Sequence, residues 1–323
     1  MNKHYLGILR IFVFLFLLIT ADQVIGLFLR KLYFNQKYGK DFSLIYSFRD
    51  CKEDILIFGA SQAQHNYDPR IISDSLKMSC YNAGQDGGHS ILLFYAQIKV
   101  ILDRYIPKII VVDLGSYHEL EYKIGNYHKL AILEPFYKVY PTLRPLILLR
   151  SPFEKFKLLS SIYPFNSKII SILRFNTNLD KGKQWMLKGF IPIKNKIMDP
   201  SSIESEKNDS SNKYLDNNIV ISLENLIKLC KNKNVKLYFT ISPIYQLELN
   251  QNSLPTKSQE KLLEIIGREN IQLINLMDNK TFRDNPYLFA DQTHLNEQGA
   301  KKYSSLIGGT LKRVEVDKHQ NTK

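Results

Sequence analysis

The segment Asp54-Ile55-Leu56-Ile57-Phe58-Gly59-Ala60-Ser61 combines four consecutive apolar residues with a glycine turn and a serine. A short continuous apolar run is typical of a strand in a parallel sheet that is buried on both faces. In open α/β folds, ligands bind at the carboxyl edge of such a sheet. The segment therefore predicts an α/β fold in which Ser61 lies at the ligand-binding edge.

The chain that follows alternates between predicted helices and strands. Asp68 and Pro69 fit the cap and the first position of a helix that runs to Leu76. Apolar residues recur at helical spacing between Ser90 and Tyr105. The further predicted strands are Met78 to Asn82, Lys108 to Leu114, Val235 to Ile241 and Ile271 to Leu276, and the further predicted helices are Ile219 to Lys231, Ser258 to Gly267 and a final helix capped by Asn296.

The segment Asp291-Gln292-Thr293-His294-Leu295-Asn296 supplies the groups that a serine nucleophile needs. A Ser hydroxyl is a poor nucleophile until an imidazole removes its proton, and an acid fixes the tautomer of that imidazole. Ser61 considered alone is more typical of a helix N-cap. Its combination with Asp291 and His294 in an α/β chain favours a Ser61–His294–Asp291 catalytic triad.

Three blocks of the sequence resemble the SGNH (GDSL-like) hydrolase superfamily: Gly59-Ala60-Ser61, Asn82-Ala83-Gly84-Gln85-Asp86-Gly87 and Asp291-Gln292-Thr293-His294. The resemblance covers residues from about 54 to 122 and from about 218 to 311. It implies a three-layer α/β/α sandwich around a mainly parallel, flavodoxin-like sheet, with an oxyanion hole formed by the N–H groups of Ser61 and Gly84. The chain resembles in particular the membrane-anchored relatives that serve cell-envelope polysaccharide O-acetylation.

The chain departs from the superfamily in the block that usually reads Gly-x-Asn-Asp. The corresponding stretch, Val112 to Glu119, has no Asn at the expected place. One oxyanion donor typically lowers the barrier by roughly 2.7 to 4 kcal/mol. The departure therefore predicts a slow enzyme, a substituted donor or lost activity.

The N-terminus is almost wholly apolar from Tyr5 to Ala21, apart from Arg10. A spanning helix needs about 20 apolar residues, so we expect it to continue past Asp22 toward Leu29. No small-residue cleavage site follows, which favours an uncleaved anchor over a removed signal peptide. A buried or amphipathic helix of a soluble protein is the alternative.

We expect residues 1–32 to form the membrane anchor and residues 33–323 the SGNH-like domain. Lys3 and Arg10 favour a cytoplasmic N-terminus, which would place the domain in the periplasm or at the cell surface. Arg30 and Lys31 on the other flank weaken this orientation.

Between about residues 120 and 217 the predicted strands give way to helical runs. Aromatic and basic residues interleave there, as in Lys155-Phe156-Lys157. One interpretation is a helical insertion that shapes an acyl or glycan site, and the other is ordinary helical packing.

Composition bounds the partners and cofactors. Forty-four basic and 31 acidic residues give a net charge of +13, which favours anionic neighbours such as lipid headgroups or acidic glycans. No zinc-finger spacing or RNP-like motif supports nucleic acid. Cys51, Cys80 and Cys230 have no metal-ligand spacing, and whether any of them oxidise stays open. We predict neither a metal nor another cofactor.

These patterns predict a serine esterase or an O-acyltransferase. Water as the second nucleophile would give an esterase, and a sugar hydroxyl would give a transferase. The expected partners are an acyl ester or polysaccharide substrate, the membrane, and a membrane-bound acyltransferase that supplies the acyl group. The alternatives are an inactive envelope protein that binds glycan or a membrane partner, and a nucleotide-binding module. The latter is disfavoured because the glycine-rich stretch from Gly84 to Gly88 lacks a P-loop lysine.

Overall fold

The computed structural model describes residues 3–39, 41–115, 119–177, 187–202, 214–245 and 256–320. The chain divides into two compact units. The helical unit consists of Met1–Ile45 and Tyr127–Lys183, and the sheet unit consists of Tyr46–Asn126 and Gln184–Lys323. The anchor at 1–32, the domain at 33–323 and the insertion at about 120–217 stay predictions.

The sheet unit is built on five parallel strands in the order β2-β1-β3-β4-β5. In β1, Ile55 lies opposite Cys80 of β2 and Ile109 of β3. This order is that of a flavodoxin-like, doubly wound sheet. The predicted fold class is therefore confirmed. The strands are β1 (Ile55–Phe58), β2 (Cys80–Asn82), β3 (Ile109–Asp113), β4 (Lys236–Ile241) and β5 (Gln272–Asn275).

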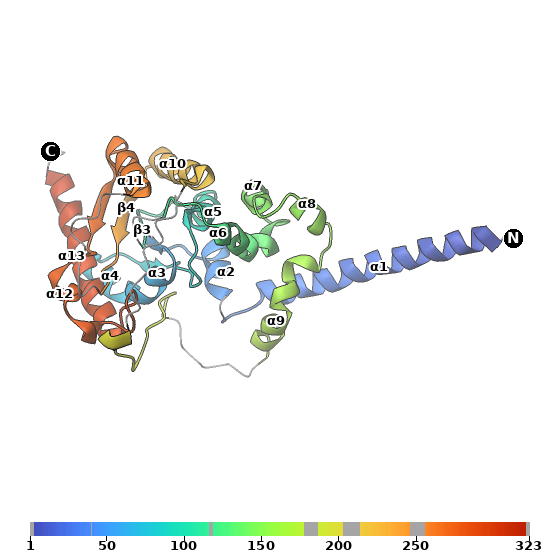
Figure 1. Cartoon of the computed structure of the whole chain (residues 1–323), viewed down its shortest axis with the longest axis horizontal. Helices are drawn as coiled ribbons and strands as arrows, with labels where there is room; N and C mark the ends of the chain where they lie inside the picture. The colour runs from blue at the N-terminus through green and yellow to red at the C-terminus, as the bar shows by residue number, and fades with distance from the viewer. Residues whose placement is uncertain are drawn as a thin grey trace. The chain divides into compact units, whose positions relative to one another are not determined.

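Helices cover both faces of this sheet and give three layers (Figure 1). On one face α13 packs against α3 and α4. On the other face α10 packs against α5, and ion pairs such as Lys231–Glu269 tie α10 to the end of α11. These helices are α3 (Ser61–Asn66), α4 (Pro69–Leu76), α5 (Ile91–Leu102), α10 (Asn217–Asn232), α11 (Lys257–Arg268) and α13 (Glu297–Gln320).

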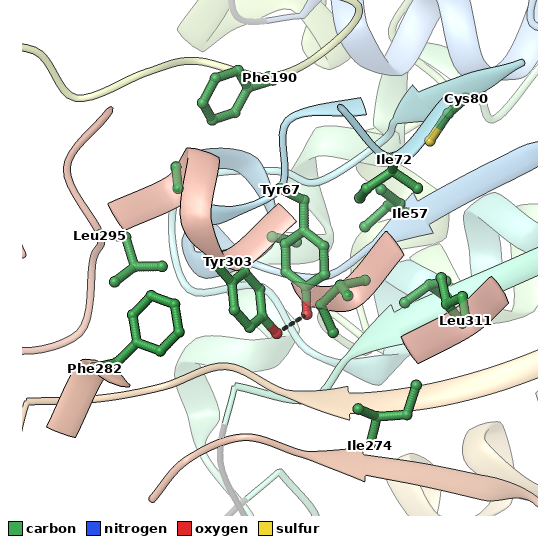
Figure 2. Close-up of a cluster of buried hydrophobic side chains, with 14 of the residues drawn as sticks. Ile57, Tyr67, Ile72, Cys80, Phe190, Ile274, Phe282, Leu295, Tyr303 and Leu311 are labelled. Atoms are coloured by element: carbon green, nitrogen blue, oxygen red, sulfur yellow. Dashed lines mark hydrogen bonds between the residues drawn. The ribbon is translucent and has the colours of Figure 1, made fainter. Parts of the chain in front are cut away.

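A buried core between the sheet and the layer of α3, α4 and α13 contains two tyrosines with a shared hydrogen bond. The Tyr67 and Tyr303 hydroxyls lie 2.9 Å apart, and Figure 2 shows them among aliphatic and aromatic side chains. The Asp113 carboxylate, at the end of β3, accepts hydrogen bonds from the Tyr67 and Ser242 hydroxyls. Since a buried tyrosine hydroxyl needs a partner, this network fixes the residue after α3 to the end of β3.

The structure contains one helix that the sequence analysis did not predict. Residues Ser61–Asn66 form α3. The physical reason is tertiary, because the Asn82 side chain donates to the carbonyls of Ala63 and Tyr67. The predicted final helix, α13, continues to Gln320.

The helical unit is organised around the second half of α1 (Lys3–Phe34). From His4 to Ala21 its side chains are exposed, with Leu6 partly so. From Asp22 onward a stripe at helical spacing is covered, and it includes Gly26, Leu29 and Tyr33. The Tyr33 ring is fully buried against Phe136 and Phe165. This half of α1 is therefore part of a packed core.

Polar side chains on α1 are also satisfied within the helical unit. The Asp22 carboxylate accepts hydrogen bonds from the Ser160 hydroxyl at 2.5 Å and from the Ser161 N–H at 2.7 Å. The Gln23 side chain accepts one from the Ser161 hydroxyl at 2.7 Å.

The remaining helices of the two units are α2 (Phe42–Arg49), α6 (Ile124–Lys129), η1 (Leu130–Phe136), η2 (Pro141–Leu143), α7 (Arg144–Leu148), α8 (Glu154–Lys157), η3 (Tyr163–Lys168), α9 (Ile169–Phe175), η5 (Pro200–Ser202), α12 (Lys280–Arg283) and η6 (Pro286–Leu288).

Candidate active site

Ser61 is the first residue of α3 and follows β1 after a tight turn. The turn requires glycine at position 59, where φ is +152°. A Cβ there would lie 2.6 Å from the Ala63 Cβ and 2.9 Å from the Asp113 carbonyl oxygen. The N-cap of α3 is Ala60, without a side-chain cap bond. The Ser61 hydroxyl is therefore not used for capping and projects from the carboxyl edge of the sheet.

His294 and Asp291 lie in the loop between η6 and α13. The His294 Nε2 atom is 2.8 Å from the Ser61 hydroxyl oxygen. Its Nδ1 atom is 2.8 and 3.0 Å from the two Asp291 carboxylate oxygens. Because Nδ1–H donates to Asp291, the Nε2 lone pair faces the Ser61 hydroxyl. The structure thus brings together the three side chains, and their catalytic roles stay a prediction.

The Asp291 carboxyl is held in its ionised form. Partial burial alone would raise its pKa, but the hydrogen bond and charge of His294, with the N–H groups of Thr293 and His294, hold the pKa well below its usual value. Lys196 adds a distant cation, with its Nζ atom 3.9 Å from the carboxylate. An ionised Asp291 can orient the His294 ring and stabilise the imidazolium that forms when His294 takes a proton.

Helix α3 itself holds the loop that carries His294. The buried Asn66 side chain accepts a hydrogen bond from the Leu295 N–H at 3.0 Å. Gln62 donates to the Thr293 carbonyl at 3.1 Å. Because both bonds come from the helix that presents Ser61, the hydroxyl and the imidazole are positioned against each other by neighbouring residues. Asn296 then caps α13, as predicted, by accepting from the N–H groups of Gln298 and Gly299.

The N–H groups of Ser61 and Gly84, the two expected oxyanion donors, differ in the hydrogen bonds that they make in the structure. The Gly84 N–H donates to the Asn82 side-chain oxygen at 2.9 Å. Across the described ranges, no acceptor is bonded to the Ser61 N–H. Gly84 would therefore serve an oxyanion only if the bond to Asn82 opened or was shared. In the stretch from Val112 to Glu119, residues 116–118 lie outside the described residues.

His65 lies beside the Ser61, His294 and Asp291 side chains, and the sequence analysis did not predict it as a site residue. Its ring centroid is 5.6 Å from that of His294, with the planes nearly perpendicular. Its Nδ1 atom is 2.7 Å from the Ile191 carbonyl oxygen, so Nδ1 carries the proton and Nε2 a lone pair. Burial, together with the His294 charge, lowers the pKa of His65. The i, i+4 spacing from Ser61 would have indicated this neighbour had α3 been predicted.

No cluster of metal-binding side chains occurs in the part of the chain that the structure describes. There, His, Cys, Asp and Glu side chains do not gather in groups of three or more that would hold a metal ion. Cys51, Cys80 and Cys230 are buried free thiols. Burial raises the pKa of Cys230 to about 12, so this thiol stays protonated and unreactive.

Comparisons with known proteins find similarity among solved structures. No family model and no curated protein matches the sequence. One similar structure is the crystal structure of an acetyl xylan esterase, AlAXEase, with 12% identity over 77% of this chain and 96% of the other and a TM-score of 0.37. Another is a putative lipolytic protein of the G-D-S-L family from Desulfitobacterium hafniense DCB-2, with 8% identity over 79% of this chain and 98% of the other and a TM-score of 0.36.

At these identities and TM-scores the two likenesses assign no activity to this chain. Its own sheet order gives it a flavodoxin-like α/β fold, in which Ser61 follows β1 and His294 follows β5.

Proposed function

We propose that this protein is a serine esterase or O-acyltransferase that acts through a covalent acyl-Ser61 intermediate. The observation that carries the proposal is the pair of 2.8 Å contacts that joins Ser61 to His294 and His294 to Asp291. These separations lie within the range that a nucleophile and its general base need. These contacts support a nucleophilic Ser61 hydroxyl, with His294 as its base and Asp291 as the group that orients the base.

The first half-reaction forms the acyl-enzyme. His294 Nε2 takes the hydroxyl proton while the Ser61 oxygen attacks the ester carbonyl carbon. The tetrahedral intermediate then expels the alcohol, which receives that proton from His294. The Ser61 N–H is free to donate to the developing oxyanion.

The second half-reaction decides between hydrolysis and transfer. His294 now removes a proton from the incoming hydroxyl, which attacks the acyl carbonyl. The second tetrahedral intermediate then expels the Ser61 oxygen, which receives that proton from His294. Water yields a free acid, and a sugar hydroxyl yields a new ester. The His65 Nε2 lone pair supports a hydroxyl-rich acceptor, because it can accept a hydrogen bond from a second hydroxyl beside the attacking one. We therefore favour a short acyl ester on an envelope glycan, with the acyl group supplied by a membrane-bound acyltransferase.

We also infer that α1 anchors the chain in a membrane with the catalytic unit on the extracytoplasmic side. Residues His4–Phe34 are long and apolar enough to cross a membrane, as an anchor or a signal sequence. The buried Tyr33 ring favours an anchor, because removal of the helix would uncover the core of the helical unit.

A direct test measures acyl release by the full-length chain in detergent micelles. An acetyl ester should be turned over by the wild type and not by Ser61→Ala, and an organophosphonate should label only the wild type. Ser305→Ala is the matched control, because Ser305 lies exposed on α13 with its hydroxyl bonded to the Lys301 carbonyl. Equal turnover by the wild type and Ser61→Ala would remove the proposal.

A non-catalytic envelope protein is the second candidate, and one observation favours it. The Gly84 N–H is engaged by Asn82, and the stretch after β3 lacks the family's Asn donor. A protein of this kind would bind an envelope glycan without forming an acyl-enzyme. Failure of Ser61 to label, combined with unchanged glycan affinity in His294→Ala, would favour this reading.

A further inference from the structure

The helical unit exposes three large apolar side chains around the short helix α8. Phe153 is 68% exposed, Phe156 69% and Leu159 71%. Single exposed apolar residues are normal on a soluble surface, but three within seven residues indicate an interaction site.

The charge of the same surface is one-sided. Residues 127–177 contain only two acidic residues, Glu134 and Glu154, and both are buried and bonded to Arg150. The acidic groups of this segment are thus withdrawn from the surface, which leaves it basic. An anionic partner fits this surface better than a neutral or basic one. The basic residues of the segment are Lys129, Lys138, Arg144, Arg150, Lys155, Lys157, Lys168 and Arg174.

The position of the patch along α1 identifies the partner. Ser160, the residue after Leu159, donates its hydroxyl to Asp22 of α1. The part of α1 from His4 to Ala21 is exposed and apolar, and its length at 1.5 Å per residue is about 27 Å, near the thickness of a bilayer core. The segment that follows α8 contacts α1 at Asp22, directly beside the exposed part of the helix (Figure 1). The patch therefore lies at the level where α1 would leave the hydrocarbon.

We propose that Phe153, Phe156 and Leu159 insert into the headgroup region of an anionic bilayer, with Lys155 contacting lipid phosphates. Aromatic and aliphatic tips beside basic side chains are the residue types that hold helices at a membrane interface. The proposal rests on the anchoring of α1 proposed above. It gives residues 127–177 the role of an interfacial platform.

The test uses the full-length chain in nanodiscs of neutral lipid or of neutral and anionic lipid. Phe156→Cys is labelled with a fluorophore, and so is Leu159→Cys in a second variant in case the first is perturbed. Nitroxide-labelled lipid and aqueous iodide are the two quenchers. Phe14→Cys reports the anchor, since Phe14 is exposed on the free part of α1. The wild type measures background labelling of the three buried cysteines.

The expected result is quenching of the position-156 label by the nitroxide lipid and protection from iodide in anionic nanodiscs. Lys155→Gln should lower the ratio of docked to undocked molecules about fivefold there, the factor that corresponds to the loss of one basic charge at an anionic surface, with little change in neutral nanodiscs.

Three outcomes would overturn the proposal, and they differ in what they leave standing. Quenching at position 14 with free iodide access at 156 and 159 removes the interfacial patch but keeps the anchor. Protection from iodide without quenching by the nitroxide lipid means that a protein partner or a second copy covers the patch. Absence of lipid quenching at position 14 removes both the anchor and the patch.

Discussion

Asp291 shows how a single carboxylate prepares the site for chemistry. It accepts the Nδ1–H of His294 and thereby directs the Nε2 lone pair at Ser61. In Asp291→Asn the amide can donate to Nδ1 and favour the wrong tautomer. We expect kcat for an acetyl ester to fall on the order of 10⁴-fold, the typical loss for such a change in a triad. Asp278→Asn, at another loop position of the sheet unit, is the control and should retain wild-type kcat.

The depressed pKa of Asp291 also links folding to pH. Because its folded-state pKa lies below the unfolded value of 3.8, the ionised carboxylate stabilises the fold above pH 3.8, and that stability is lost as the pH falls through the folded-state pKa. The difference in Tm between the wild type and Asp291→Asn should therefore be constant near neutrality and shrink below pH 3.8. A difference that grows on acidification would contradict the assignment.

His65 provides a separate test of the acceptor. We expect His65→Gln to lower kcat/KM for a sugar acceptor by about 2- to 10-fold, the worth of one hydrogen bond, because the ring no longer presents Nε2. Organophosphonate labelling of Ser61 should be unchanged, since the triad is untouched. A parallel loss of labelling would show that His65 only supports the local structure.

The sequence motifs predicted which side chains come together at the site, but they did not predict all of the hydrogen bonds around them. Ser61, Asp291 and His294 could be chosen because acyl transfer needs those three groups. The bond from the Gly84 N–H to Asn82 could not be foreseen, because it depends on the side-chain rotamer that Asn82 adopts while it also holds Ala63 and Tyr67.

At the level of elements, the turn between β1 and α3 determines where Ser61 lies. In Gly59→Ala the new Cβ would meet Ala63 and the Asp113 carbonyl, and the backbone would be strained at φ +152°. We expect a loss of roughly 1–3 kcal/mol in the free energy of unfolding and a large loss of turnover, measured by chemical denaturation and ester hydrolysis.

Gly267→Ala is the matched control for that variant. Gly267 lies within α11, and a Cβ there has no neighbour within 4 Å. Alanine should stabilise the helix by about 0.5–1 kcal/mol and leave turnover unchanged. Similar destabilisation by both variants would mean that the tight turn has no special role.

Elements with a strong local pattern could be predicted, and elements held by distant partners could not. The Asp68 cap and Pro69 start of α4 were predicted because both signals are local. Helix α3 was missed because its six residues are supported by bonds from Asn82 and Gln64 to remote carbonyls rather than by their own propensity.

On the scale of the whole molecule, the two halves of α1 have different neighbours, and truncation separates them. Deletion of residues 2–21 should give a chain that stays folded in detergent-free buffer, because Asp22, Leu29 and Tyr33 keep their contacts. Deletion of residues 2–34 should lower the Tm and cause aggregation, because Phe136 and Phe165 lose Tyr33. Thermal unfolding and size-exclusion chromatography measure both. Equal behaviour of the two truncations would show that the second half of α1 is dispensable.

The composition and the apolar run predicted a candidate span, but not its pairing with residues 127–177. That pairing joins segments with no shared motif, and it depends on a buried stripe of α1. Because α1 is almost uniformly apolar, its sequence shows no periodic pattern that would mark this stripe.

The contact between Asp22 and Ser160 also sets an order of events during synthesis. The two residues are 138 positions apart, so α1 emerges long before the chain that satisfies its carboxylate and covers Tyr33 exists. Until then the second half of the helix carries an unpaired acid and an uncovered aromatic stripe. The core around Tyr33 can therefore be completed only after the chain has been synthesised beyond Phe165.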